Sequence, residues 1–498
     1  MLVHRSGKVE MIIVGSHSQI MIPQLGMGRA SGGRLSGVRL IHTHLGGEDI
    51  SDEDLMDLLF LRLDLLSMIK VNPDGLPENM YTAHLLSGGD DRGNWNFLPP
   101  VHPANQNDSA EELIAAIEAE FAAKRAGSKV DTKQDRAILV SVATEPKIQA
   151  EESLAELIEL ALSDNVIVLD SVLQRRHKIN PRLILGKGKL AEIMIKALQL
   201  DANLLIFNQE LNPSQIRSIT DFSDLRVIDR TQLILDIFAH RAMSREGKLQ
   251  VEMAQLKYML PRLSSRDDAL SRLTGGIGAR GPGETKLEID RRRINDRLAR
   301  LAKELKKVSK ERYRRRAKRR KKDLPVLSLV GYTNAGKSTL LNTLTNSDII
   351  AENKLFATLD PTSRRLRFPT DMEVILTDTV GFIKDLPTDL LQAFMATLEE
   401  LKEADLLVHV VDISNPSFRQ QMKVVDDLLA ELDLRDLPVL KLYNKIDLLD
   451  DDQQVSQLVG SDALVVSAIN RKTLKFFLHE AEKIIGKIDT TSWAQIES

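Results

Sequence analysis

An eight-residue segment that begins at Gly331 constrains the fold of this chain more than any other feature. It reads Gly-Tyr-Thr-Asn-Ala-Gly-Lys-Ser and ends with Lys337 and Ser338. The apolar run Val326–Val330 precedes it and an amphipathic segment follows, so the motif joins a strand to a helix. This is the P-loop pattern in the context that it requires, and it predicts a doubly wound α/β domain that binds a nucleotide.

A P-loop binds phosphates mainly with its backbone. Its glycines let successive N–H groups turn inward, and the helix N-terminus adds a positive dipole end. We expect Lys337 to reach the β- and γ-phosphates and the Ser338 hydroxyl to bind Mg²⁺. The residues expected to contact the nucleotide here are Gly331, Tyr332, Thr333, Asn334, Ala335, Gly336, Lys337, Ser338 and Thr339.

A second motif, Asp378-Thr379-Val380-Gly381, follows the apolar strand Val374–Thr377 about 40 residues after the P-loop. An Asp at the end of a strand can hold the water shell of Mg²⁺, and the Gly381 N–H can contact the γ-phosphate. The next residue is Phe382, where many Ras-like GTPases carry a glutamine that orients water. Phe cannot do this, so we expect slow hydrolysis until another molecule completes the site.

Two later motifs identify the base as guanine. Asn444-Lys445-Ile446-Asp447 follows a strand, and the Asp447 carboxylate can accept hydrogen bonds from the guanine N1–H and N2 amine. Adenine lacks both donors and would leave the carboxylate unpaired. Ser467 and Ala468 follow the last strand and can supply a backbone N–H to guanine O6. The sequence thus predicts a GTPase domain.

A mobile switch is expected between the P-loop and Asp378. The segment there is Phe356-Ala357-Thr358-Leu359-Asp360. Thr358 is the expected second protein ligand of Mg²⁺ beside Ser338, with Thr362 as the competing choice. The expected catalytic residues are Lys337, Thr358 and Gly381. Asn334 stands where some monovalent-cation-dependent GTPases carry Asn, which leaves stimulation by K⁺ open.

The chain before the P-loop divides into three parts. Residues 1–130 contain a helix after Ser51, with Leu55, Leu58, Leu59, Leu65, Leu66 and Ile69 expected on one face, and residues 86–110 have the composition of a loop. Residues 131–243 alternate strand and helix, which predicts a mostly parallel α/β layer. Heptad runs in residues 244–322 predict an antiparallel helical hairpin, with Pro261 ending or kinking its first helix. A glycine-rich loop joins the helices. The GTPase domain is expected over 323–487, followed by a tail, 488–498.

Charge is distributed unevenly along the chain. The net charge is −3, but residues 284–322 contain 19 Lys and Arg against 6 Asp and Glu. A strongly basic rod in an otherwise acidic protein is typical of nucleic-acid binders. The chain has no cysteine and no apolar run of the ~20 residues that cross a bilayer, so we expect a cytoplasmic protein without a membrane span. We also expect a monomer.

The motifs together resemble the HflX family of the Obg–HflX GTPases. Besides the three GTPase motifs, the resemblance rests on Leu185–Lys189, Phe207–Pro213, Val227–Thr231, Glu246–Gln250 and Gly275–Glu288. It implies GTP hydrolysis with Mg²⁺, stimulated by ribosomes, and binding to the 50S subunit and its 23S rRNA through the α/β domain and the basic hairpin. It also implies splitting of 70S ribosomes, including ribosomes stalled under stress.

Two other functions compete with this interpretation. The chain could be a GTPase that assists assembly of the large subunit, which would require affinity for immature particles. It could instead be a nucleotide-gated RNA-remodelling protein, with a second nucleotide bound near the basic turn Gly186–Lys189 of the α/β layer. Asp447 argues against ATP in the GTPase domain itself.

Overall fold

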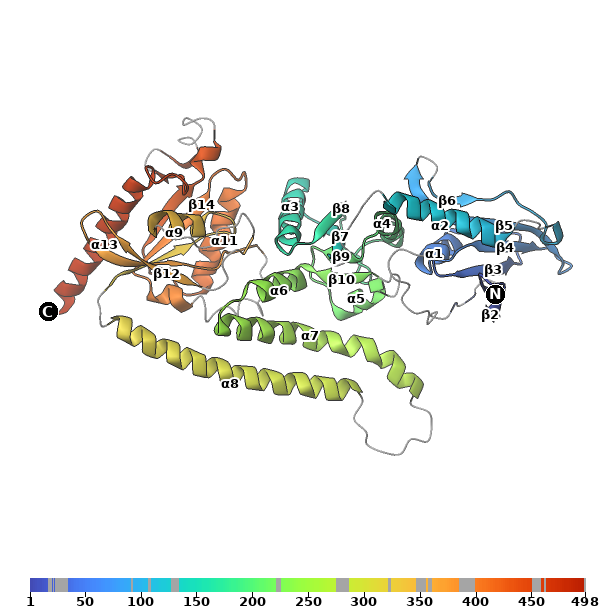
Figure 1. Ribbon diagram of the computed structural model, residues 1–498, viewed down its shortest axis with the longest axis horizontal. Helices are drawn as coiled ribbons and strands as arrows, with labels where there is room; N and C mark the ends of the chain where they lie inside the picture. The colour runs from blue at the N-terminus through green and yellow to red at the C-terminus, as the bar shows by residue number, and fades with distance from the viewer. Residues whose placement is uncertain are drawn as a thin grey trace. The chain divides into compact units, whose positions relative to one another are not determined.

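The computed structural model divides the chain into two compact units, residues 1–230 and 231–498 (Figure 1). It describes all residues except 17–19, 21, 23–34, 91–92, 106–108, 127–133, 221–224, 275–285, 321–323, 346–354, 357–360, 385–398, 450–457, 461–462 and 497–498. Both units combine helices with sheets, which confirms the α/β class expected from the sequence.

The first unit opens with a six-stranded sheet in the order β2-β1-β3-β4-β5-β6. Only β3 and β4 pair in parallel. The strands are β1 (Leu2–His4), β2 (Val9–Met11), β3 (Val38–His44), β4 (Leu66–Val71), β5 (Pro77–Asp90) and β6 (Gly93–Phe97), and the helices are α1 (Asp52–Phe60), η1 (Pro103–Asn105) and α2 (Ala110–Ala126).

Two predictions for this region were wrong in part. The helix after Ser51 exists, and Ser51 and Asp54 form a capping box at its start, but it stops at Phe60. Arg62 takes a left-handed conformation with φ of 48°, and Leu66 and Ile69 lie in β4 instead. Part of 86–110 is strand because β5 and β6 pair with each other. Backbone pairing satisfies their polar groups despite the loop-like composition.

A four-stranded parallel sheet in the order β10-β9-β7-β8 completes the first unit and confirms the predicted α/β alternation. One apolar cluster includes side chains from both sheets, among them Leu40 and Val140. The elements are β7 (Arg136–Ala143), α3 (Lys147–Ser163), β8 (Ile167–Arg175), α4 (Lys187–Leu200), β9 (Leu204–Phe207), α5 (Pro213–Thr220) and β10 (Arg226–Asp229).

A buried polar network ties this sheet to its helices. The Asn208 amide, just after β9, donates to Ser153 Oγ at 2.8 Å and accepts from the Arg230 guanidinium at 3.1 Å. Arg230 also pairs with Glu156 of α3 at 2.5 Å. Asn208 and Arg230 both belong to segments that carry the family resemblance, and here their hydrogen bonds stabilise the fold because buried polar groups need partners.

The second unit begins with α6 (Arg230–Arg241), although Arg230 itself is counted with the first unit. A hairpin of two long helices follows, α7 (Arg245–Thr274) and α8 (Lys286–Arg320). Helix α7 continues through Pro261, so the proline does not end it. The Arg297 guanidinium makes two parallel contacts with the Glu252 carboxylate, at 2.7 and 2.8 Å, and Leu301 is fully buried. The glycine-rich loop, including Arg280, lies outside the described residues.

The remainder of the unit is a six-stranded sheet in the order β12-β13-β11-β14-β15-β16, parallel except at β12. All five predicted strands are present, and only the edge strand β12 was missed. The elements are β11 (Val326–Val330), α9 (Lys337–Thr345), β12 (Thr362–Arg367), β13 (Glu373–Asp378), η2 (Glu399–Glu403), β14 (Leu406–Asp412), α11 (Phe418–Glu431), β15 (Val439–Asn444), η3 (Ile446–Leu448), β16 (Leu464–Val465) and α13 (Leu474–Ile496).

The centre of this sheet contains a buried histidine. His409 of β14 is 1% exposed, and burial lowers its pKa from 6.5 to about 4, although Asp426 opposes the shift. The folded protein therefore keeps the ring neutral at pH values where the unfolded chain protonates it. For a base whose pKa is depressed by folding, stability is full above pH 6.5 and falls as the pH drops toward 4.

We therefore predict that His409 costs the second unit about 2 kcal/mol of stability between pH 7 and pH 5. His409→Leu should remove this part of the acid sensitivity, measured as the change in thermal midpoint between the two pH values. His479→Leu, at an exposed position in α13, is the matched control. Equal acid sensitivity in both variants would contradict the assignment.

Candidate nucleotide site and basic helix

The P-loop connects β11 to α9 and needs glycine at its turn. Gly336 has φ of +91°, a conformation that side chains disfavour, and a Cβ built there would lie 2.3 Å from Asn444 Nδ2. Gly331 is equally closed, since a Cβ would lie 2.3 Å from the Val410 carbonyl oxygen. Neither position accepts a larger residue without displacing the loop.

Lys337 lies at the first position of α9 and is buried. Its ammonium donates to the carbonyl oxygens of Gly331, at 3.1 Å, and Tyr332, at 2.7 Å. Burial lowers the pKa of Lys337 to about 8, and the nearby Asp378 only partly opposes this. A phosphate placed in the loop would favour the charged ammonium, because an opposite charge compensates for lost hydration.

The two groups expected to hold Mg²⁺ meet directly. Ser338 Oγ donates to Asp378 Oδ2 at 2.6 Å, and Asp378, at the end of β13, is 0% exposed. Hydroxyl and carboxylate oxygens are the ligands that Mg²⁺ prefers, used together with waters and phosphate oxygens. The donor set therefore fits the ion.

The second motif lies against the P-loop. The Thr333 N–H donates to the Phe382 carbonyl at 2.7 Å, and the Phe382 N–H donates to the Gly331 carbonyl at 3.1 Å. Gly381 directly precedes Phe382, and a Cβ there would come within 3.0 Å of Lys337 Nζ. Gly381 is thus held beside the lysine that is expected to contact the terminal phosphate. Thr379 and Val380 are buried next to it.

Phe382 turns away from this site. Its ring is 2% exposed and belongs to an apolar cluster with Val330, Leu407 and Val425. The side chain therefore packs in the core and offers nothing to a water molecule at the terminal phosphate. Phe382 stands where many Ras-like GTPases carry glutamine, and here it offers only its backbone to the nucleotide site.

Asn444 joins the phosphate-binding and base-binding parts. Its Nδ2 donates to the Ala335 carbonyl and its Oδ1 accepts from the Ala468 N–H, both at 2.8 Å. The side chain is 1% exposed. The sequence predicted Asn444 as a nucleotide contact, and the structure shows in addition that it fixes two loops relative to each other.

The base-reading groups occupy the ends of the last two strands. Asp447 is exposed in η3, and Lys445, with a left-handed φ of 68°, pairs with Asp412 at 2.8 Å. The Ser467 N–H donates to Thr473 Oγ1 at 3.0 Å, while the Ala468 N–H is used by Asn444. Donation from the Ala468 N–H to guanine O6 stays a prediction. Guanine O6 would have to share this N–H with Asn444 Oδ1.

Only the start of the predicted switch is described. Phe356 has φ of 55°, is 2% exposed and packs edge-on against Phe238 of α6, with ring centroids 4.6 Å apart. Ala357, Thr358, Leu359 and Asp360 lie outside the described residues, so Thr358 as a metal ligand stays a prediction. Thr362 begins β12 and is paired with Asp378 in register.

Sequence reasoning missed two threonines that support the site. Thr343 Oγ1 in α9 donates to the Ala468 carbonyl at 2.6 Å, and Thr473 Oγ1 caps the turn after Ser467. It also missed Asp412, the partner of Lys445. The position of Asp412 at the carboxyl end of the buried strand β14 is a signal that could have identified it.

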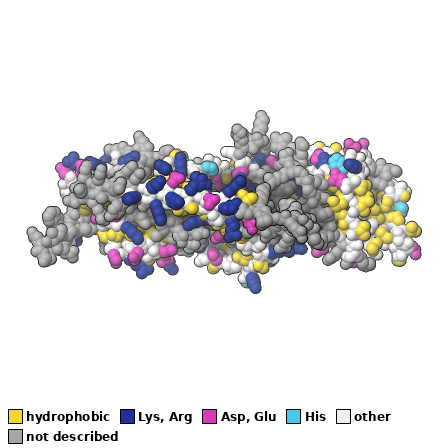
Figure 2. Space-filling view, turned by 90° about the horizontal axis from the view of Figure 1, so that it is seen from below, with side chains coloured by type: hydrophobic (Ala, Val, Ile, Leu, Met, Phe, Trp, Pro, Cys, Tyr) yellow, Lys and Arg dark blue, Asp and Glu magenta, His cyan; other side chains and the backbone are white. Residues whose placement is uncertain are grey.

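Helix α8 has a basic face on the side opposite the hairpin contact. Arg300, Lys303, Lys307 and Lys310 recur every three or four residues, so they share one face, and all four are exposed. Leu301 and the half-buried Leu305 lie on the other side. Figure 2 shows Lys and Arg side chains gathered along this surface with few acidic neighbours. Such a stripe suits the regularly spaced phosphates of a nucleic acid.

None of the described helices is long and apolar enough to cross a membrane.

Comparisons with known proteins agree with these features. Three family models match: "GTP-binding GTPase N-terminal" over 151–239, "GTP-binding GTPase Middle Region" over 241–319 and "50S ribosome-binding GTPase" over 326–445. A GTPase HflX of Caldanaerobacter subterraneus is 51% identical over 71% of this chain and 81% of its own length. One of Escherichia coli is 45% identical over 60% of this chain and 70% of its own.

A solved GTP-binding protein of Sulfolobus solfataricus in complex with GDP is also similar. It is 24% identical, covers 71% of this chain and 100% of its own, and gives a TM-score of 0.40.

We predict that Asn444→Ala weakens GDP and GTP binding by about 10- to 100-fold. The substitution leaves the Ala335 carbonyl and the Ala468 N–H without this partner, at about 1–3 kcal/mol for a buried group. Fluorescent-nucleotide titration measures the effect, with Asn295→Ala, at an exposed position of α8, as the control. Unchanged affinity in Asn444→Ala would mean that the bridge does not organise the site.

Proposed function

This chain belongs to the HflX family of GTPases, and we propose that it binds the 50S ribosomal subunit through α8 and uses GTP to split 70S ribosomes. The splitting of ribosomes stalled under stress is part of this proposal. The observation that carries it is the exposed basic face of α8, formed by Arg300, Lys303, Lys307 and Lys310. The matched family model over 326–445, described as a 50S ribosome-binding GTPase, supports the same partner.

The proposed partner follows from the chemistry of the surface. Four positive charges on one helix face, with hydrophobic residues on the opposite face, give the helix one side for packing and one for phosphates. Arg and Lys contacts to 23S rRNA phosphates would position the protein without reading base sequence. Binding should weaken steeply with salt, since each neutralised phosphate releases a counterion.

The nucleotide site supplies the switch in this proposal. Water attacks the γ-phosphorus of GTP, the bond to the β-phosphate oxygen breaks, and GDP and phosphate result. Lys337 contacts the phosphates, and Gly381, which lies so close to the lysine that a Cβ at residue 381 would come within 3.0 Å of its Nζ, donates its N–H to the terminal phosphate. Mg²⁺, held through Ser338, Asp378 and Thr358, would neutralise phosphate charge. Loss of the terminal phosphate releases Gly381 and Thr358, and with them the ribosome-binding state.

The buried Phe382 supports control by the ribosome. Because its ring packs in the core, the motif offers no side chain at this position to orient the attacking water. A group supplied from outside, or a K⁺ ion at Asn334, would complete the site. We propose that ribosome binding provides this completion, which would keep GTP from being consumed by the free protein in the cytoplasm.

A role in large-subunit assembly is the competing proposal. The same basic face and the same switch would serve it, because both functions need 50S contacts. The difference is the particle acted upon: splitting removes 70S ribosomes, whereas assembly requires preference for immature large subunits.

The test replaces the basic face and follows both binding and splitting. The triple variant Arg300→Glu, Lys303→Glu and Lys307→Glu should bind 50S subunits at least about tenfold more weakly near 0.1 M salt, since several phosphate contacts are lost. The control reverses three exposed lysines of the GTPase domain, Lys472, Lys475 and Lys483, with the same change in net charge. GTP affinity should be unchanged in both.

Sedimentation of 70S ribosomes with protein and GTP reports the outcome. The natural protein and the control variant should convert 70S into subunits, and the α8 variant should not. Binding without loss of 70S would favour assembly, and equal 50S binding by both variants would refute α8 as the ribosome contact.

A further inference from the structure

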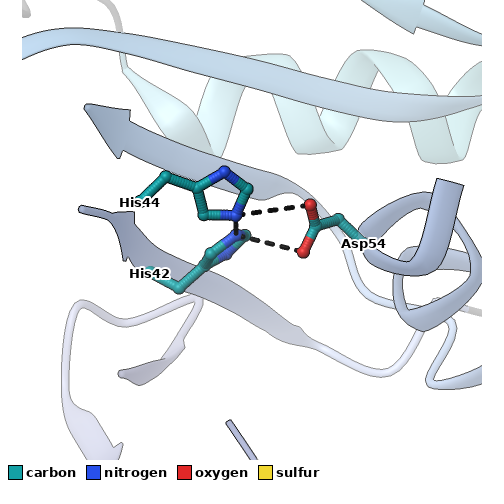
Figure 3. A group of neighbouring side chains, drawn as sticks. All are labelled: His42, His44 and Asp54. Carbon is teal, nitrogen blue, oxygen red and sulfur yellow. Dashed lines mark hydrogen bonds and ion pairs between the residues drawn. The ribbon is translucent and has the colours of Figure 1, made fainter. Parts of the chain in front are cut away.

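The first sheet carries a cluster of metal-ligating side chains that the nucleotide site does not use. His42 and His44 lie two residues apart on β3, so both rings project from the same face of the strand. Asp54, in the first turn of α1, faces them (Figure 3). We propose that His42, His44 and Asp54 bind one divalent transition-metal ion.

The spacing of the ligand atoms fits such an ion. The two Nε2 atoms are 3.1 Å apart, His42 Nε2 lies 3.2 Å from Asp54 Oδ1, and His44 Nε2 lies 3.5 Å from Asp54 Oδ2. Ligand atoms at ~2.0–2.1 Å from a tetrahedral ion are about 3.3 Å from one another. Each ring nitrogen thus lies near this spacing from the other ring nitrogen and from one carboxylate oxygen, and one ligand atom from each of the three residues lies within 4.8 Å of the others.

Neighbouring groups orient two of the ligands. His44 Nδ1 lies 3.3 Å from the Glu48 carbonyl, which accepts only from a protonated nitrogen, so Nε2 of the neutral ring carries the lone pair. Asp54 Oδ2 accepts from the N–H and the hydroxyl of Ser51, at 2.8 and 2.7 Å. Metal ligands are commonly held by such outer hydrogen bonds.

The partial exposure of two of these side chains leaves room for one further ligand of the ion. The side chains of His42, His44 and Asp54 are 4%, 15% and 17% exposed. The inner ring is enclosed, while the other two groups reach the surface, where a water can complete the coordination. Two imidazoles and one carboxylate suit Zn²⁺ or a similar first-row ion, whereas Mg²⁺ and Ca²⁺ prefer oxygen ligands.

The bound ion would tie the start of α1 to the middle of β3. The proposal does not depend on GTP or on the ribosome, because none of its residues belongs to the second unit. The alternative is a hydrogen-bonded cluster in which a proton on His42 Nε2 takes the place of the metal.

The test measures metal retained by the full chain, purified without a polyhistidine tag. Metals are first removed with a chelator, and Mg²⁺ and GDP are then added in excess so that the nucleotide site is filled. The protein is next dialysed against Zn²⁺ or Co²⁺, and the ion is counted by mass spectrometry. We expect about one ion per chain for the natural protein and for His4→Ala, an exposed histidine on β1.

Three variants separate metal loss from misfolding. His44→Gln and Asp54→Asn should retain less than about a tenth of an ion, and Ser51→Ala should weaken binding about tenfold through the outer hydrogen bonds. Metal-free thermal midpoints identify any variant that fails to fold. Zn²⁺ should raise the midpoint of the natural protein but not that of His44→Gln. Equal metal content in the natural protein and His44→Gln, or none in either, would overturn the proposal in favour of the proton-sharing cluster.

Discussion

The amide of Asn444 is the interaction on which the nucleotide site depends. One side chain donates to the P-loop carbonyl of Ala335 and accepts from the N–H of Ala468, both at 2.8 Å and both buried. The phosphate end of the site is therefore fixed relative to the base end by the protein itself. Glycine at 336 is a consequence, because a Cβ there would lie 2.3 Å from the same amide. Thr343 adds a second tie from α9 to Ala468.

The groups around the Asn444 bridge determine how the rest of the nucleotide site is arranged. Backbone bonds between Gly331, Thr333 and Phe382 place Gly381 beside Lys337, and Ser338 meets Asp378 where a magnesium ion fits. The Phe382 side chain belongs to the core and leaves the water side of the site without a polar group from that position. In the proposed function, such a site binds GTP and needs a group from another molecule to complete it for hydrolysis. We propose that the ribosome, bound at the basic face of α8, is that other molecule.

The motifs were readable from the sequence because their chemistry demands fixed residue types at fixed positions. The P-loop, Asp378 and Asn444 appeared where expected, as did the parallel strands of the four-stranded sheet and of the GTPase domain, whose buried apolar runs are distinctive. Two edge strands were not readable: β12 is mostly polar and β6 is rich in Gly and Asn, so both depend on a partner strand for their hydrogen bonds. Leu66 and Ile69 continue a helical pattern into β4, since the left-handed Arg62 that ends the helix has no strong sequence signal. The Asn444 bridge and the His42–Asp54 contact join residues distant in sequence or separated by a turn, so spacing alone could not reveal them.

The most direct test of this account is the rate of GTP hydrolysis by the purified chain, measured alone and with saturating 50S subunits. The salt concentration is chosen so that the chain stays bound to the 50S subunits. A site that lacks its own water-orienting side chain should turn over slowly alone and at least about a hundredfold faster with 50S, in the range that a supplied catalytic group gives. Turnover that is already fast without ribosomes, or unchanged by 50S, would contradict the central claim that the nucleotide site is built complete for binding and incomplete for hydrolysis.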